Sequence, residues 1–107
     1  MLVGLRRGAT MKTLEEILGI LRAHRGELAE EYGVKWLGIF GSYARGEAQP
    51  ESDLDVLVEF TEPPGMFRFL ALERRLSELL GVKVELVTRS ALKPHIGQHI
   101  LEEIVPV

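Results

Sequence analysis

Two aspartates stand two residues apart in the middle of the sequence, and they are the only aspartates among its 16 acidic residues. Asp53 and Asp55 fall in the stretch SDLDVLVEF, whose apolar alternation is typical of a β-strand. Residues two apart on a strand project from the same face, so the two carboxylates are expected side by side. Such a pair repels itself unless a cation lies between its members, and short aspartate side chains suit the rigid oxygen shell of Mg²⁺. The pattern therefore predicts a magnesium site.

A Gly-Ser pair precedes these aspartates at a short distance in the sequence. Gly41 and Ser42 open the segment GSYARG, which is expected to form a short helical turn. Free backbone N–H groups at a helix start favour phosphate, and glycine lets the backbone approach it closely. Ser42 adds a hydroxyl donor, and Arg45 adds a permanent positive charge suited to phosphate oxygens. A phosphate cradle beside a metal-binding carboxylate pair predicts phosphoryl or nucleotidyl transfer.

Helices are predicted on both sides of the aspartate strand. Thr13 and Glu16 have the spacing of a capping box, and apolar residues recur behind them at helical spacing, which predicts a first helix over residues 12–32. A second helix follows a Pro-Pro-Gly break and ends before Gly81. The C-terminal tail predicts one short helix that ends before Pro106.

Strands are expected in three apolar segments, which are residues 34–40, 53–60 and 82–88. In the third segment, Glu85 alternates with buried-type residues and can face the aspartates. The predicted fold class is α/β, a small mixed sheet of at least three strands with helices packed on one face and the carboxylates on the other. Residues 1–11 are expected to be an N-terminal extension and residues 12–107 a single domain.

Composition excludes several classes of protein. The 107-residue chain has no cysteine, which excludes disulfides, thiolate zinc sites and thiol catalysis and fits a reducing, cytoplasmic setting. Its net charge of −3 gives no basic surplus for binding a phosphate backbone, so nucleic acid is not expected as the main partner. No apolar run reaches the roughly 18 residues that a membrane span needs.

The spacing of GSYARG and SDLDVLV resembles the signature of the polymerase-beta-like nucleotidyltransferase superfamily. It looks like the smallest branch of that superfamily, the minimal nucleotidyltransferases, and the similarity extends to the ILEEIVPV tail. The resemblance implies the polymerase-beta-like fold, with Asp53 and Asp55 binding the catalytic Mg²⁺ ions. It also implies that Gly41 and Ser42 hold the triphosphate of ATP or another NTP. The third acidic position of the family falls on Glu85.

The same resemblance implies a reaction and a partner. A nucleoside monophosphate, with AMP expected, is transferred from an NTP to a hydroxyl. In the minimal branch the acceptor is implied to be a tyrosine of a separate helical protein, an RNase toxin of the HEPN type. The chain is then its antitoxin and forms a hetero-oligomer with it.

Two alternatives to this reading remain open. The family commonly has aspartate where this chain has Glu85, and a 1 Å misplacement of a catalytic group can cost about a hundredfold in rate. The first alternative is therefore a weak or inert site in an antitoxin that neutralises its toxin by occlusion. The second is a subunit of an enzyme that modifies a small molecule such as an aminoglycoside.

Other residues have structural interpretations. Tyr43 either covers the GSYAR turn or lines the nucleotide pocket, and Trp36 is expected to pack in the core. Charged residues of the second helix are expected on a solvated face, and these are Glu73, Arg74, Arg75 and Glu78. Apolar residues of the tail either pack in the core or meet a partner, and these are Ile96, Ile100, Leu101 and Ile104.

Overall fold

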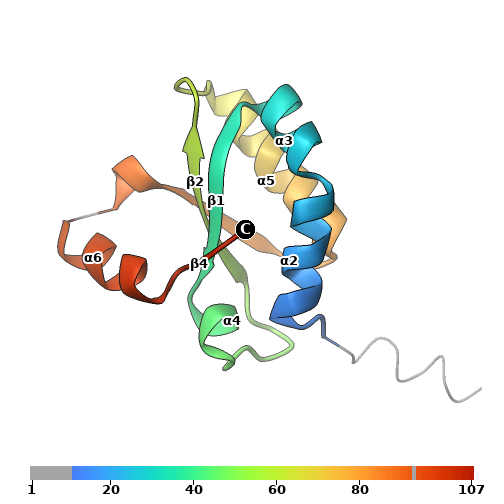
Figure 1. The fold of residues 1–107 in the computed structure, drawn as a ribbon, viewed down its shortest axis with the longest axis vertical. Coiled ribbons are helices and arrows are strands. Elements are labelled where there is room, and N and C mark those ends of the chain that lie inside the picture. Colours follow the sequence, from blue (N-terminus) through green and yellow to red (C-terminus); the bar gives the residue numbers. More distant parts are fainter. Residues whose placement is uncertain (1–10, 93) are drawn as a thin grey trace, which may run out of the picture.

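A computed structural model describes residues 11–92 and 94–107, with side chains described for all of these except residues 94–96. A mixed sheet lies between two helical layers (Figure 1). One layer holds α2 (Leu14–Ala23), α3 (Arg25–Tyr32) and α5 (Met66–Leu80), and the other holds α6 (Pro94–Glu103). The four-residue helix α4 (Ser42–Arg45) lies at one end of the sheet, and the 3-10 turn η1 (Arg89–Ala91) follows the last long strand. No helix in the described part of the chain is long and apolar enough to cross a membrane.

The N-terminal extension expected over residues 1–11 is described only at its end. Residues 1–10 lie outside the described residues. Met11 is half-buried and packs against the core, so the packed part of the chain already includes it.

The sheet has four strands, which are β1 (Val34–Phe40), β2 (Leu54–Phe60), β3 (Val84–Thr88) and β4 (Val105–Pro106). Their order is β3-β2-β1-β4. β1 is antiparallel to both of its neighbours, whereas β2 and β3 are parallel and are joined through α5. The prediction of a mixed α/β sheet of at least three strands is confirmed, and the C-terminal tail adds a fourth, two-residue strand.

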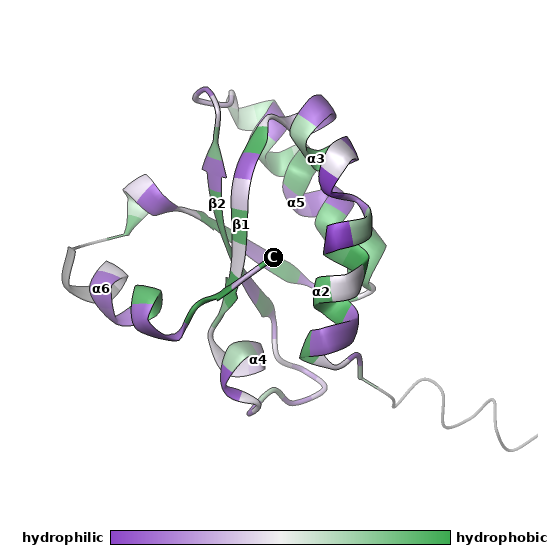
Figure 2. Ribbon diagram, viewed as in Figure 1, coloured by the Kyte–Doolittle hydropathy of each residue, from purple (hydrophilic) through white to green (hydrophobic). Residues whose placement is uncertain are grey.

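The main core lies between the sheet and the layer formed by α2, α3 and α5. Apolar residues of these helices face the strands, while their polar residues face outward (Figure 2). Alternation along β2 sends Leu54, Val56 and Val58 into this core, where all three are fully buried. Burying one such aliphatic side chain contributes about 1.5–3 kcal/mol. The register of β2 is therefore fixed, and Asp53 and Asp55 are held on the opposite face.

The first predicted helix is broken into two. Its capping box is confirmed, because the Thr13 side chain accepts from the Glu16 backbone N–H and the Glu16 side chain accepts from the Thr13 N–H. The expectation of one helix over residues 12–32 is wrong at His24, which has φ −105° and ψ 11°. There the imidazole Nδ1 lies 2.9 Å from the Ile20 carbonyl oxygen. This local hydrogen bond competes with continuation of the helix.

The break turns α3 so that it reaches α5. Arg75 donates from Nε to Glu27 Oε2 at 2.7 Å and from Nη2 to Glu27 Oε1 at 3.0 Å, a bidentate pair. Arg75 was expected on a solvated face, and it instead joins α5 to α3 through a residue 48 positions away in sequence. These hydrogen bonds lower the pKa of Glu27.

This pair predicts a pH-dependent contribution to stability. Because the pKa of Glu27 is lower in the folded chain, the pair stabilises the fold above the ordinary glutamate pKa and the contribution is lost as the pH falls through the lowered value. We expect Glu27→Gln to lower Tm at neutral pH and to leave it nearly unchanged at about pH 2.5. Thermal unfolding measures this, with exposed Glu30→Gln as the matched control. An equal loss of Tm at both pH values would contradict the expectation.

Side chains of α5 also satisfy the open edge of β3. The backbone N–H of Val84 donates to Ser77 Oγ at 3.1 Å, and that of Leu86 donates to Glu73 Oε2 at 3.1 Å. An edge strand otherwise presents unpaired N–H groups that invite pairing with another chain. The solvated role expected for Glu73 is therefore also wrong, since this side chain covers a sheet edge.

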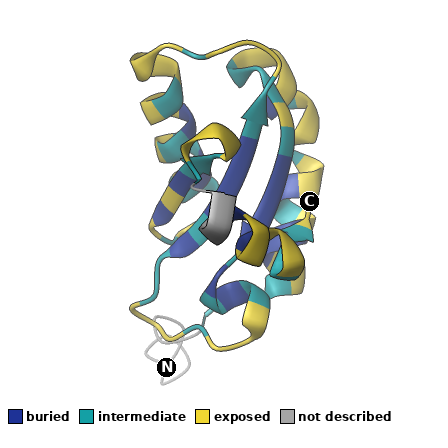
Figure 3. Cartoon of the chain, turned by 90° about the vertical axis from the view of Figure 1, so that its left-hand side faces the viewer, coloured by how far each residue is buried: buried dark blue, intermediate teal, exposed yellow. Residues whose placement is uncertain are grey.

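The second face of the sheet is covered in part by α6, as the view from that side shows (Figure 3). Gly38 is paired with Leu57 on this face, and Leu57 is fully buried although it lies outside the main core. A Cβ atom at Gly38 would lie 2.7 Å from Ile104 Cδ1, so only glycine lets the tail pack this closely. Ile100 is buried and Leu101 is 40% exposed, so the tail divides between packing and an open surface. The Ile96 side chain lies outside the described residues.

Candidate active site

The turn after β1 brings the backbone against a carboxylate. Register pairs Phe40 with Asp55, so the end of β1 lies beside the start of β2. Gly41 follows with φ +77° and ψ −152°, a conformation essentially restricted to glycine. A Cβ atom at Gly41 would collide with Asp55 Oδ2. Glycine is therefore required both by its dihedral angles and by the closeness of the carboxylate.

Helix α4 begins directly at this turn. No side chain caps its start at Gly41, so the first N–H groups of the helix are open to an anion. Ser42 is half-buried at the first helical position. The turn closes at Gly46, which is left-handed at φ +74°, and Glu47 N–H donates to the Ser42 carbonyl at 2.8 Å. The expected short helical turn is confirmed, and it begins at Gly41, which lies against the Asp55 carboxylate.

Three carboxylates share the face that the sequence predicted. Asp53 directly precedes β2, and Asp55 is paired in register with Glu85 of the parallel strand β3. Asp55 is half-buried, while Glu85 is exposed at the sheet edge. Lys83 Nζ lies 4.0 Å from Asp53 Oδ2, with the lysine side chain 81% exposed, so this contact neutralises little of the charge.

The electrostatics of the face favour a bound cation. Burial raises the pKa of Asp55, and the negative charges of Glu85 and Asp53 raise it further. The positive charge of Arg45 acts in the opposite direction, but the net shift is upward. A carboxylate placed so that its own charge is disfavoured is a frequent property of functional sites.

The donor set fits magnesium. Among the side chains that the structure describes, in residues 11–92 and 97–107, no group of three carboxylate or imidazole side chains is already gathered tightly enough to enclose a metal ion. Magnesium is commonly held by only one or two carboxylates, with substrate phosphates and water completing its octahedral shell. Asp53 and Asp55 would supply those carboxylates, and Glu85 stands beside them. The phosphate oxygens would come from a nucleotide at the Gly41-Ser42 turn.

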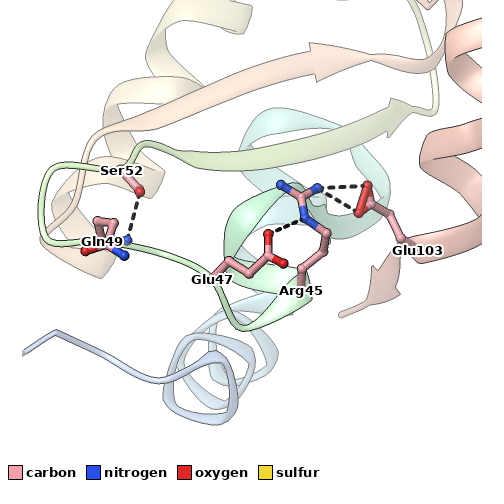
Figure 4. Close-up of polar contacts among 5 residues, drawn as sticks. All are labelled: Arg45, Glu47, Gln49, Ser52 and Glu103. Atoms are coloured by element: carbon pink, nitrogen blue, oxygen red, sulfur yellow. Dashed lines mark hydrogen bonds and ion pairs between the residues drawn. The ribbon is translucent and has the colours of Figure 1, made fainter.

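Arg45 lies at this site but is engaged by two glutamates (Figure 4). Its Nε donates to Glu47 Oε1 at 2.9 Å, and its Nη1 donates to Glu103 Oε2 at 3.1 Å and Oε1 at 3.3 Å. These hydrogen bonds raise the pKa of the guanidinium. Sequence reasoning proposed Arg45 but missed both partners. Glu47 is visible two residues away, whereas Glu103 is 58 residues away and gives no local signal.

Two aromatic residues of these segments have structural positions and not positions in the candidate site. Tyr43 is 7% exposed and belongs to the main core, so of its two interpretations the structure favours packing over lining the pocket. Trp36 is half-buried and is paired with Glu59 on the second face, outside the main core in which it was expected. Leu37 and Ile39 of the same strand point into the main core, so the β-strand alternation itself puts Trp36 on the opposite face.

Comparisons with known proteins agree with this arrangement. Residues 21–107 match the family of nucleotidyltransferase domains. The chain is 52% identical over 97 residues to the protein adenylyltransferase MntA of Thermococcus cleftensis, covering 91% of this chain and 98% of that protein. A solved structure of a minimal nucleotidyltransferase is 39% identical, with a TM-score of 0.70 over 84% of this chain and 95% of that chain.

A more distant structure shares the fold. The complex of a tri-AMPylated HEPN toxin with its MNT antitoxin from Shewanella oneidensis gives a TM-score of 0.59 at 17% identity, over 82% of this chain and 69% of that chain. With a glycine turn and an aspartate pair on one face of a matching fold, the chain belongs to the nucleotidyltransferase domain family and is a minimal nucleotidyltransferase.

Proposed function

We propose that the chain is a Mg²⁺-dependent protein adenylyltransferase that transfers AMP from ATP to a tyrosine of a HEPN-type toxin and thereby acts as its antitoxin. The observation that carries this proposal is the approach of Gly41 to the Asp55 carboxylate, because it puts the turn that we propose to bind phosphate directly beside the carboxylate face. The AMP group and the protein acceptor are supported by the name of the Thermococcus relative. The toxin is supported by the Shewanella complex, whose toxin is AMPylated.

The proposed reaction breaks a phosphoanhydride bond of ATP and forms a phosphodiester bond to tyrosine. The tyrosine oxygen attacks the α-phosphorus, a new P–O bond forms, and the bond to the β-phosphate oxygen breaks so that pyrophosphate leaves. Magnesium, when bound, neutralises the phosphates and activates the attacking oxygen. Asp53 and Asp55 would hold the metal on their shared face. Gly41 and Ser42 bind the β- and γ-phosphates through the backbone N–H groups and the hydroxyl.

Glu85 has the third role in this proposal. It lies opposite Asp55 in the β2–β3 register, so it would help to hold the metal or would accept the proton that the tyrosine loses. A glutamate reaches further than an aspartate by one methylene. Because β3 is an edge strand and Glu85 is exposed, the longer side chain has room to adjust.

We expect Glu85→Gln to lower kcat roughly 10- to 50-fold while leaving the KM for ATP within about twofold, because a group acting at the acceptor side is needed in the transition state more than in nucleotide binding. Pyrophosphate release with the partner toxin as acceptor measures both constants. Glu62→Gln, an exposed glutamate in the loop after β2, is the control. An unchanged kcat in Glu85→Gln would remove Glu85 from the site.

The occlusion alternative predicts a different result in cells. If neutralisation depends on transfer, the variant Asp53→Ala/Asp55→Ala should bind the toxin but fail to protect cells that express it. Protection equal to wild type, with the variant folded normally by circular dichroism, would show that the chain neutralises its toxin by binding alone.

A further inference from the structure

Glu103, the last residue of α6, contacts Arg45 of helix α4 although it lies far from the GSYARG segment in sequence. Glu103 is 22% exposed in its side chain and lies within hydrogen-bond distance of Arg45 through both carboxylate oxygens. Its charge also contributes to the raised pKa of Asp55, so Glu103 lies within electrostatic reach of the carboxylate face. Nothing in the GSYARG or SDLDVLV segments identifies it.

The two glutamates occupy two of the three nitrogens of the guanidinium. Glu47 takes Nε and Glu103 takes Nη1, and Arg45 Nη2 has no hydrogen-bond partner among the described residues. In Figure 4 this nitrogen lies on the side of the guanidinium away from Glu103. An arginine side chain loses considerable rotamer freedom when it binds an anion, unless its fork is already held in place. The contacts therefore restrain the guanidinium and leave two N–H donors free.

The tail that carries Glu103 is anchored to the strand that carries the turn. β4 begins two residues after Glu103 and pairs with β1 at Gly38 and Ile39. The Val107 N–H also donates to the Leu37 carbonyl at 3.0 Å. Because β1 leads directly into Gly41, these backbone contacts fix the position of Glu103 relative to the Gly41-Ser42 turn.

We propose that Glu103 is a positioning residue, which holds Arg45 so that Nη2 is directed to the triphosphate bound at the Gly41-Ser42 turn. This inference rests on the proposed function, because it assigns an additional residue to the same nucleotide site. Glu103 itself does not touch the nucleotide. The same contacts would also suit a competing role, in which the triphosphate must displace Glu103 from Arg45. That role predicts that Glu103→Gln tightens nucleotide binding, whereas positioning predicts that it weakens binding.

The test is the affinity for a non-hydrolysable ATP analogue with Mg²⁺, measured by isothermal titration calorimetry. We expect Glu103→Gln to weaken binding about three- to tenfold, and to raise the KM for ATP by a similar factor with kcat nearly unchanged. Exposed Glu102→Gln, the neighbouring residue with the same charge change, should leave affinity within about twofold. The exposed Arg45 pair contributes little to stability, so the Tm of Glu103→Gln should stay within about 2 °C of wild type.

A double-mutant cycle separates positioning from a general charge effect. In an Arg45→Gln background, Glu103→Gln should have almost no further effect on affinity, because the residue that it positions is gone. Tighter binding in Glu103→Gln would establish competition instead. The proposal would also be overturned if Glu103→Gln left the affinity unchanged, or if it weakened binding as much in the Arg45→Gln background as in the wild-type background.

The outcomes distinguish this inference from the proposed function. If the wild-type chain binds the analogue but transfers no AMP to a protein, the proposed function fails. The role of Glu103 is still decided by the affinity of Glu103→Gln for the analogue. If the wild-type chain binds no nucleotide with Mg²⁺, both proposals are overturned.

Discussion

Replacing Asp55 with asparagine should lower kcat/KM for AMP transfer by at least about a thousandfold, and it should make the metal-free protein more stable rather than less. A thousandfold loss corresponds to about 4 kcal/mol of transition-state stabilisation, the scale expected when a metal that neutralises phosphate is no longer held. Asparagine has nearly the same shape as aspartate, so the packing against Gly41 is retained. The activity loss then reports the charge and not the fold.

The expected gain in stability follows from the raised pKa of Asp55. When the pKa of a carboxyl group is higher in the folded state, the free energy of unfolding falls as the pH rises through that pKa. Ionised Asp55 therefore destabilises the fold at neutral pH. Removing the charge should therefore raise the Tm of the metal-free chain, by an amount that solvent screening of the half-buried carboxylate keeps small. Thermal unfolding in the presence of a chelator measures this.

A control on the same strand completes the experiment. Glu59 lies on the same face of β2 as Asp55, and its carboxylate is 3.7 Å from Arg89 Nη1 at the other end of the strand. Glu59→Gln should leave AMP transfer within about twofold of wild type and should not raise Tm. A Tm that falls in Asp55→Asn would contradict the view that this carboxylate is placed for a cation at the expense of stability.

Gly41→Ala should be the most damaging single methyl group that can be added to the chain near the site. The dihedral angles at Gly41 are essentially unavailable to alanine, and the added Cβ would collide with the Asp55 carboxylate. We expect a loss of stability of about 3 kcal/mol or more and a fall in AMP transfer of at least about a hundredfold, since the turn and the carboxylate cannot both keep their places. Chemical denaturation and pyrophosphate release measure the two effects.

Gly46→Ala is the matched control for this change. Gly46 closes the same helix, with φ +74°, but no atom lies within 4 Å of the Cβ that alanine would add. It should cost only about 1 kcal/mol, the ordinary penalty for a left-handed residue. In addition, the cost of Gly41→Ala should shrink in an Asp55→Ala background, because the colliding carboxylate is removed. An equal loss of stability in the two backgrounds would show that alanine at position 41 does not clash with Asp55.

The parts of the fold that follow local periodicity were predictable from the sequence. β1 was predicted at residues 34–40 and is observed at Val34–Phe40, and the alternation along β2 placed Asp53 and Asp55 together on the face away from the core. A short helical turn was also predicted over residues 42–46, and a helix is observed at Ser42–Arg45. In each case the signal lies within a few residues, and the hydrophobic alternation leaves one solution.

The parts that depend on contacts between distant residues were not predictable. The break at His24 depends on a side chain bonding its own helix, which propensity does not reveal. Arg75 and Glu103 look like ordinary solvated charges in sequence, and only the packing of α3 on α5 and of the tail on β1 gives them partners. The contact between Arg45 and Glu103 in the candidate site could therefore be identified only from the three-dimensional structure.

The most direct test of the central claim is the intact mass of a candidate HEPN-type partner after incubation with this chain, Mg²⁺ and each of the nucleoside triphosphates in turn. Fragment spectra of any modified partner identify the residue that carries the added group. Asp53→Ala/Asp55→Ala, mixed at the same concentration, is the control. We predict that ATP adds one or more AMP groups to tyrosine and that the control adds none. A stable complex whose partner keeps its unmodified mass with every nucleotide would contradict the account.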